Sequence, residues 1–203
     1  MRARAPATCV SPRRHDEALE AIRSAVVAAA KPLDERTLRR LPAVARLGAE
    51  HVVPLLAAAE RFPEVRRAGP WWWRAGLEND EDAPWANLVR RLQANVGQGA
   101  FDENTATSVE REAIRWLVAA GRIVALEPGH YWTRSHFDGF VERVRAQWRP
   151  SADSFAAGKT LSELREALGL SRRDAVRCFE ALDRAGITVR DGDLRRLRPA
   201  DER

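Results

Sequence analysis

The sequence predicts a mostly α-helical protein with small β-hairpins, built of tandem winged-helix (helix-turn-helix) modules. Three stretches of the chain, 55–75, 114–135 and 178–198, share one order of features. Each begins as the end of a helix with an apolar face and then meets a glycine or proline that breaks the helix. Two short strands joined by a turn follow, and helical sequence precedes each stretch. Helices followed by a two-stranded wing are the plan of a winged helix.

The turns between the paired strands carry the residues that tight turns require. They are Ala68-Gly69-Pro70, Glu127-Pro128-Gly129 and Asp191-Gly192-Asp193. Glycine, proline and aspartate supply the backbone angles and local hydrogen bonds of such turns. The copies recur about every 60 residues, too far apart for a solenoid repeat but enough for a minimal domain. The alternative is three unrelated helix–hairpin units within one α/β domain.

The helices are expected in the following order. Apolar periodicity and capping residues place them over 16–30, 34–41, 48–61, 83–96, 108–120, 135–148, 160–168 and 171–185, with a short turn or helix over 102–106. Asp34, Ser108 and Ser171 are the expected N-caps, and Gly169 ends the helix before the last one.

These elements divide the chain into a disordered basic arm and three modules. The arm covers 1–15, and the modules cover 16–77, 78–133 and 134–203. The segment 149–159, rich in proline, serine, alanine and glycine, is the clearest linker, and the acidic stretch 78–82 separates the first two modules. We expect the helix 135–148 to complete the last core, with Trp148 near Phe179, so that 134–203 folds without the rest.

The charge of the chain favours an anionic partner. The formal net charge is +5 and the isoelectric point is about 10.1. Lys31 and Lys159 are the only lysines, so almost all of the basic residues are arginines. Arginine presents a planar fork of donors that suits phosphate and the edge of guanine. A GC-rich genome is the alternative explanation for the abundance of arginine, although it does not explain the positions of the arginines.

Several functional classes are disfavoured. The alanine- and valine-rich run at 26–30 is too short to span a bilayer, and no apolar segment follows the basic N-terminus directly, so we expect a cytoplasmic protein without a membrane partner. Cys9 and Cys178 suggest no disulfide framework, and Cys178 is expected to be inert packing rather than a reactive thiol. The four histidines form no metal-ligand pattern. We therefore expect no catalytic residues, no cofactor and no metal, and no enzymatic activity.

The last module carries the candidate nucleic-acid site. On a helical wheel of 171–185, Ala175, Val176, Phe179 and Leu182 face the core. Arg173, Arg177 and Arg184 share the opposite side with Glu180. In helix-turn-helix proteins this helix contacts nucleic acid with its N-terminal residues. The candidate nucleic-acid-binding residues are Arg172, Arg173, Arg177, Arg190, Arg195, Arg196 and Arg198. The alternative is a solvated face with Arg177–Glu180 and Glu180–Arg184 pairs.

The segment 169–198 resembles the last winged helix of the bacterial selenocysteine-specific elongation factor (SelB). The residues that carry this resemblance are Gly169, Ser171, Arg172, Glu180, Asp183, Gly186, Thr188, Arg190, Gly192, Asp193 and Arg195. The resemblance extends over roughly 108–198. Arg173 and Asp174 replace the lysine and aromatic residue that are usual in the family, and the chain contains no Gly-x-x-x-x-Gly-Lys-Ser/Thr loop for GTP.

The resemblance implies binding of a structured RNA, a SECIS-like mRNA hairpin, through the last module. It assigns Arg172, Arg173 and the wing arginines to the RNA, and it implies the ribosome or other translation components as further partners. Two alternatives remain open: a DNA-binding transcriptional regulator and a protein-interaction scaffold. The run Trp71-Trp72-Trp73 has two interpretations as well, because its members either pack inside the protein or stack on a base. The sequence does not indicate the oligomeric state.

Overall fold

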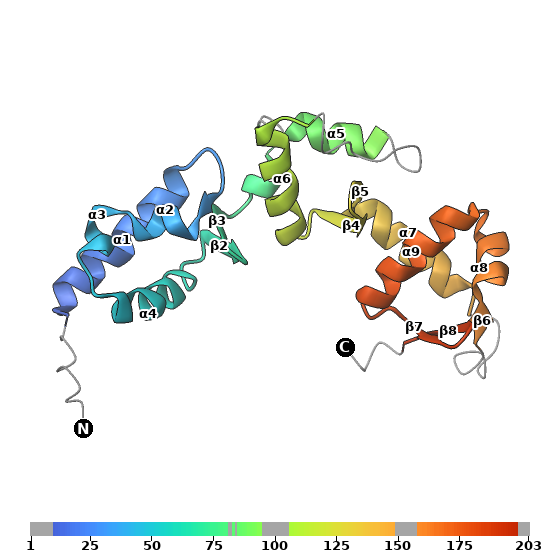
Figure 1. The fold of residues 1–203 in the computed structure, drawn as a ribbon. Helices are drawn as coiled ribbons and strands as arrows, with labels where there is room; N and C mark the ends of the chain where they lie inside the picture. Colours follow the sequence, from blue (N-terminus) through green and yellow to red (C-terminus); the bar gives the residue numbers. More distant parts are fainter. Residues whose placement is uncertain (1–9, 81–82, 84, 95–105, 149–157, 199–203) are drawn as a thin grey trace, which may run out of the picture. The chain divides into compact units, whose positions relative to one another are not determined.

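We describe a computed structural model of the chain, which covers residues 10–80, 83, 85–94, 106–148 and 158–198 (Figure 1). The chain divides into two compact units, 1–86 with 115–120 and 87–114 with 121–203. Both units are mostly helical and carry small antiparallel sheets, as predicted. No helix among the residues that the structure describes is long and apolar enough to cross a membrane.

In the described residues of the first unit, the N-terminal helices and a small sheet pack around an apolar core. Its elements are α1 (Pro12–Ala28), β1 (Leu33–Asp34), α2 (Glu35–Arg39), α3 (Pro42–Ala45), α4 (Ala49–Ala59), β2 (Val65–Ala68), β3 (Trp71–Arg74) and the short 3-10 helix η1 (Leu77–Asn79). The sheet has the order β1-β3-β2, and Arg67 pairs with Trp72 in its hairpin. Ile22, Leu38 and Leu55 are fully buried in the core.

Local signals explain most of these elements. Asp34 is the N-cap of α2 and accepts a hydrogen bond of 2.7 Å from the Thr37 amide, as expected. Hydrogen bonds from Thr37 lower the pKa of the Asp34 carboxyl. The helix α1 begins at Pro12, within the predicted arm, and residues 1–9 of that arm lie outside the described residues. β1 and α3 were not predicted because elements this short leave no periodic pattern.

The tryptophan run packs inside the first unit. Trp72 is fully buried in the core, and Trp73 is 5% exposed. The Trp73 indole donates a hydrogen bond of 2.8 Å to Glu78, and its ring lies 5.8 Å from that of Trp116. Trp85 also contacts Trp116, with ring centroids 4.9 Å apart. The packing interpretation is confirmed for Trp72 and Trp73, since neither has a face free for a base.

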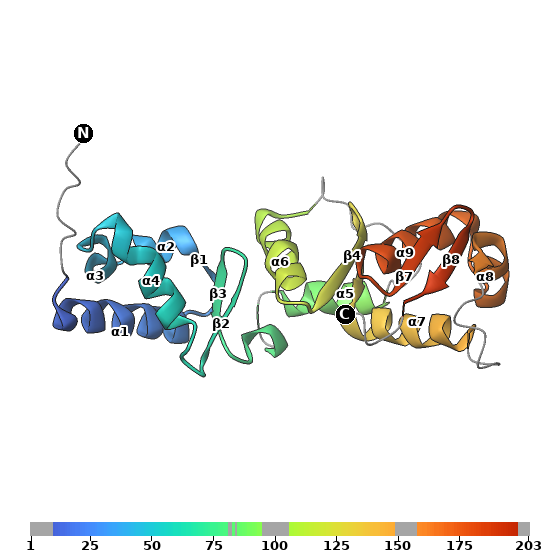
Figure 2. The ribbon, with the colours of Figure 1, turned by 90° about the horizontal axis from the view of Figure 1, so that it is seen from below.

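The described residues of the second unit form helices and two hairpins. Its elements are α5 (Ala86–Ala94), most of α6 (Ser108–Ala119), β4 (Ile123–Glu127), β5 (His130–Thr133), α7 (Arg134–Ala146), β6 (Lys159–Thr160), α8 (Leu161–Leu168), α9 (Arg172–Arg184), β7 (Thr188–Asp191) and β8 (Leu194–Leu197) (Figure 2). β4 and β5 form a two-stranded sheet, which we call the second hairpin. The other sheet has the order β6-β8-β7, in which β7 and β8 form the last wing.

Capping side chains set the starts of the last helices. Thr160 and Glu163 form a capping box at α8, in which the Glu163 carboxylate accepts from the Thr160 amide at 2.7 Å. Ser171 caps α9 as predicted, and Gly169, at φ 65°, ends α8 in the left-handed conformation that glycine adopts most readily. The segment predicted as a short turn or helix, 102–106, lies almost wholly outside the described residues.

The core of the second unit joins the second hairpin to the last helices. Trp148 and Phe179 are fully buried in the same apolar cluster, which confirms their predicted proximity. Leu126 of β4 belongs to this cluster together with Phe140 and Leu182. The module boundaries, 16–77, 78–133 and 134–203, stay a prediction, and the described core shows that Leu126, which precedes residue 134, packs with the residues that follow it.

Candidate nucleic-acid interface

The N-terminal turn of α9 presents two exposed arginines. Arg172 and Arg173 are the first residues of the helix, and neither has a side-chain partner among the described residues. Ser171 caps this turn by accepting a hydrogen bond of 3.1 Å from the Asp174 amide. A helix N-terminus carries a partial positive charge and unpaired amide groups, which favour an anion such as phosphate. The turn therefore combines a helix terminus with two exposed cationic side chains.

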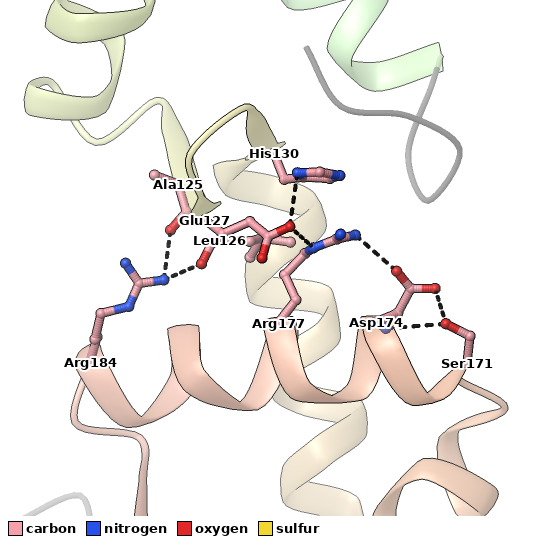
Figure 3. A network of polar contacts seen from close by, with 8 residues as sticks. All are labelled: Ala125, Leu126, Glu127, His130, Ser171, Asp174, Arg177 and Arg184. Carbon is pink, nitrogen blue, oxygen red and sulfur yellow. Dashed lines mark hydrogen bonds and ion pairs between the residues drawn. The ribbon is translucent and has the colours of Figure 1, made fainter. Parts of the chain in front are cut away.

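The acid next to these arginines is already engaged. The Asp174 carboxylate accepts a hydrogen bond of 2.7 Å from Ser171 Oγ and one of 3.0 Å from Arg177 Nη1 (Figure 3). The ion pair with Arg177 partly compensates the negative charge that would otherwise repel phosphate. Asp174, which departs from the family pattern, is thus a structural residue of the α9 cap.

Arg177 does not lie on the exposed side of α9, where it was predicted. It is 8% exposed, and its Nε donates to Glu127 Oε1 of the second hairpin at 2.7 Å (Figure 3). Cys178 is also buried, whereas Val176, expected in the core, is 38% exposed. The reason is that α9 packs on two sides, against the helices of its own module and against β4. A helical wheel of a single segment shows one buried face and does not reveal a second partner.

Arg184 is likewise committed to the second hairpin. Its Nη2 donates to the carbonyl oxygen of Ala125 at 3.3 Å and to that of Leu126 (Figure 3). Its Nε reaches the backbone carbonyl of Glu180, one turn earlier, at 3.3 Å. The predicted surface pairs with the Glu180 carboxylate are therefore replaced by contacts with β4.

His130 completes this polar group at the tip of the second hairpin. Its Nδ1 lies 3.1 Å from Glu127 Oε1 but not in hydrogen-bond geometry, so the atom is buried without a hydrogen bond among the described residues (Figure 3). Glu127 therefore has two neighbouring nitrogen groups, of which Arg177 is the hydrogen-bonded one.

Arg195 is the second arginine that points inward. It is 5% exposed, its Nε lies 3.3 Å from Asp183 Oδ2, and its guanidinium stacks over the Phe179 ring at 5.5 Å. Thr188 Oγ1 donates to the other oxygen of Asp183 at 2.5 Å. Asp183, Thr188 and Arg195 all belong to the motif that carries the family resemblance. Here they bind the last wing to α9, so this part of the motif stabilises the module.

The outer face of the last wing carries the remaining arginines. Because strand residues alternate between faces, Arg196 points away from the buried Arg195 and Leu197. Arg198 follows the end of β8 and is half-buried. Arg196 pairs with Asp191 across the hairpin at 3.2 Å. Arg190 lies at the exposed edge, and its Nε donates to the carbonyl oxygen of Gly192 at 3.0 Å, which stiffens the turn.

The structure thus sorts the seven predicted arginines into two groups. The exposed or half-exposed group contains Arg172, Arg173, Arg190, Arg196 and Arg198, and the buried group contains Arg177 and Arg195. Sequence reasoning missed that the carboxylates of Glu127 and Asp183 bind the two buried arginines. Asp183 lies close enough in sequence to be paired with a wing arginine, whereas nothing in the sequence links Glu127 to a residue 50 positions away.

The part of the chain that the structure describes contains no cluster of metal-ligating side chains. There, no three histidine, cysteine or acidic side chains lie together in a way that could hold a metal ion. Burial, together with the charge of Asp174, raises the pKa of the Cys178 thiol to about 12, so the sulfur stays protonated. Cys178 is 1% exposed and lies in the apolar core cluster, which agrees with the predicted packing role.

Comparisons with known proteins agree with the resemblance. Residues 158–197 match the family described as "Elongation factor SelB, winged helix". A solved bacterial selenocysteine-specific elongation factor, EF-Sec, superposes with a TM-score of 0.60 at 15% identity, over 94% of this chain and 30% of that one. This chain therefore spans less than a third of that factor.

A looser match involves the mRNA-binding domain of elongation factor SelB from E. coli, solved in complex with SECIS RNA. Its TM-score is 0.38 at 15% identity, over 93% of this chain and 100% of that one, and a match this loose carries no argument about the fold. No curated protein matches the sequence significantly. The predicted resemblance and the predicted fold class, winged-helix modules with small hairpins, are confirmed.

Proposed function

We propose that this chain, whose residues 158–197 match the winged-helix family of elongation factor SelB, binds a folded RNA hairpin through that last module. The observation that carries the proposal is the placement of two groups of arginines on the last module. Arg172 and Arg173 are exposed at the N-terminus of α9, and the half-exposed Arg196 and Arg198 lie in β8 and directly after it. Arginines on a helix terminus and on a wing suit the phosphate backbone of a structured nucleic acid.

The family resemblance supports RNA as the ligand. The C-terminal array of the selenocysteine-specific elongation factor binds the mRNA hairpin that recodes a stop codon, and the E. coli domain named above was solved with SECIS RNA. A SECIS-like hairpin is therefore the proposed target, and the ribosome or other translation components are proposed further partners. We propose a binding role without catalysis, in the cytoplasm.

The geometry of α9 disfavours the reading of duplex DNA. A helix-turn-helix protein inserts its recognition helix into the major groove, which is wide enough for one helix. Here the sides of α9 that carry Arg177 and Arg184 pack against the second hairpin. The exposed residues further along α9 include Val176 and Glu180, which carry no positive charge, and Arg184 is bound to β4. The exposed cationic groups that remain lie at the N-terminal turn and on the last wing. This arrangement suits the irregular surface of an RNA loop better than a uniform groove.

The test is a salt titration of binding with a set of RNA hairpins, single-stranded RNA of the same composition, and duplex DNA. Each phosphate contact contributes a log–log slope of about −0.7 on single strands and about −0.9 on a duplex. We expect the double variant Arg172→Ala, Arg173→Ala to bind hairpin RNA more weakly and to flatten the slope by about one to two.

The matched control is the double variant Arg145→Ala, Arg165→Ala, which removes the same charge from α7 and α8. If both double variants bind alike, the arginines of α9 are not the contact, and a protein-interaction scaffold becomes the better reading. If wild-type protein prefers duplex DNA to every hairpin, the transcriptional-regulator alternative replaces the RNA proposal. Crosslinking in cells with and without ribonuclease would then identify the ligand.

A further inference from the structure

A continuous chain of polar contacts runs from the second hairpin to the N-terminal turn of α9. Glu127 accepts from Arg177 Nε at 2.7 Å, and Arg177 Nη1 donates to Asp174 at 3.0 Å. Asp174 is in turn bound by Ser171, the N-cap residue (Figure 3). The chain ends at the turn that carries Arg172 and Arg173, so the position of that turn depends on contacts that start at Glu127.

Arg177 cannot serve the ligand and this chain of contacts at once. Its side chain is 10% exposed, and its guanidinium is shared between two carboxylates from different elements. Turning it outward would leave Glu127 without its hydrogen-bonded partner and would remove the compensation of Asp174 next to the proposed phosphate site. Arg177 is thus committed to the protein interior.

Apolar contacts between the second hairpin and α9 lie beside this ion pair. Leu126, the neighbour of Glu127, is 3% exposed and packs in the cluster that contains Phe179. Arg184 binds the carbonyl oxygens of β4 at the other end of α9. The second hairpin therefore contacts α9 along its length, and Glu127 is the contact nearest to the N-terminal turn.

We propose that Glu127 and Arg177 are positioning residues of the RNA site. They touch no ligand, but they hold α9 and its cap in the one orientation that presents Arg172 and Arg173 to the RNA. This inference rests on the proposed function where it predicts RNA affinity. Where it predicts amide hydrogen exchange, it rests on the contacts alone. It removes Arg177 from the predicted contact residues and adds Glu127, an acid, to the residues on which binding depends.

Glu127→Gln gives the sharpest test because simple electrostatics and positioning predict opposite changes in RNA affinity. Removing an acid near an RNA site should strengthen binding if charge alone matters. If Glu127 positions α9, binding should weaken instead, by about 2- to 30-fold, the range in which residues without ligand contact alter affinity. The control is Glu142→Gln on α7, which removes the same charge and releases Arg145 from a comparable pair of 2.7 Å.

The slope of the salt titration separates positioning from contact. Arg177→Gln should weaken hairpin RNA binding with an unchanged slope, whereas loss of a phosphate contact would flatten the slope by about 0.7 to 0.9. The double variant Glu127→Gln, Arg177→Gln should bind no more weakly than Arg177→Gln alone, because Arg177→Gln already removes the interaction with Glu127. A flattened slope for Arg177→Gln, or Glu127→Gln binding as tightly as Glu142→Gln, would overturn the proposal.

Amide hydrogen exchange tests the same contacts without RNA. In Glu127→Gln we expect faster exchange in β4, β5 and the first turn of α9 than in wild type or Glu142→Gln. If Glu127→Gln does not fold, Glu127→Asp replaces it, since this variant keeps the charge and shortens the reach to Arg177. Unchanged exchange overturns the positioning role even if the protein binds RNA. Faster exchange in a protein that binds no RNA upholds the contacts and refutes only the proposed function.

Discussion

At the scale of single residues, arginine serves two opposite purposes in the last module. Arg172 and Arg173 are exposed and free of side-chain partners among the described residues, whereas Arg195 is buried between Asp183 and the Phe179 ring. Removing one partner of a buried ion pair leaves an uncompensated charge, which costs far more than the loss of an exposed pair. Stability and binding should therefore respond to different arginines.

Asp183→Ala should destabilise the last module strongly. The substitution leaves Arg195 buried without its carboxylate and removes the acceptor of Thr188, so we expect a loss of about 3–5 kcal/mol in the free energy of unfolding. Asp193→Ala, an exposed acid in the wing turn, should change it by no more than about 0.5 kcal/mol. Urea denaturation followed by circular dichroism measures both, and equal effects of the two substitutions would contradict the structural role of Asp183.

His136 should make the second unit sensitive to acid. Burial, together with the nearby charge of Arg143, lowers the pKa of His136, and the ring lies 4.5 Å from that of Trp132. A pKa that is lower in the folded state adds stability above the ordinary value of about 6.5, and this stability is lost as the pH falls. The urea midpoint should decrease between about pH 7.5 and about pH 5.5, and less so in His136→Phe. If the urea midpoint of His136→Phe decreased as much as that of the wild type, other groups would be responsible for the acid sensitivity.

At the scale of elements, the helix starts follow from capping groups within one turn of the chain. Thr160 and Glu163 satisfy each other's backbone amides, and the Ser171 hydroxyl accepts a hydrogen bond from the Asp174 amide at the start of α9. These interactions need no tertiary partner, so they are visible in the sequence. The hairpins are visible in the sequence as well, because Gly129 and Gly192 mark their turns. Both glycines adopt the positive φ that such turns require.

Thr160→Ala should weaken α8 through the loss of its cap. We expect the free energy of unfolding to fall by about 0.5–2 kcal/mol, the usual cost of an N-cap. A hydrogen bond from the Thr160 amide lowers the pKa of Glu163, so the contribution of the capping box is present above the ordinary pKa of glutamate and is lost as the pH falls below it. Ser162→Ala, two residues further along the chain, is the control. An equal loss of stability in that variant would argue against the cap.

At the scale of the whole molecule, the second hairpin belongs physically to the helices that follow it. Leu126 lies in the core of the second unit, and both Arg177 and Arg184 bind β4. A wing of a nucleic-acid-binding module is usually free to contact the ligand. Here the second hairpin instead covers the side of α9 that would otherwise be available.

A fragment of residues 121–203 should therefore be more stable than one of residues 134–203. The shorter fragment lacks Leu126 and leaves Arg177 without Glu127, whereas the longer one keeps the complete cluster. We expect a higher melting temperature and a sharper transition for 121–203 in calorimetry. Arg177→Met should recover part of the loss in 134–203, since it removes a guanidinium that has lost one of its two carboxylate partners. Equal stability of the two fragments would place the boundary at 134, as the sequence predicts.

The chain should show no GTP turnover of its own. It contains no Gly-x-x-x-x-Gly-Lys-Ser/Thr loop, and it spans 30% of the elongation factor that it resembles. Phosphate release by pure protein measures this, and a turnover that a single substitution abolishes would contradict the expectation.

The sequence by itself determined the local elements and the fold class. Asp34, Thr160 and Ser171 marked helix starts, and the glycines of the hairpin turns marked the wings, because each signal lies within a few residues of its partner. The apolar periodicity of α9 placed Phe179 in the core, and the pattern of residues over 169–198 indicated the family. These inferences require only one segment at a time.

Only the tertiary structure decided which arginines remain available. Arg177 and Arg173 lie on the same side of the isolated helix, and they differ because Glu127 comes within 2.7 Å of one and not of the other. That contact joins residues 50 positions apart, across a hairpin whose packing no periodic pattern encodes. A helical wheel records the burial of one face, but a charged side chain becomes buried when a distant carboxylate compensates it, and this depends on how the chain is folded.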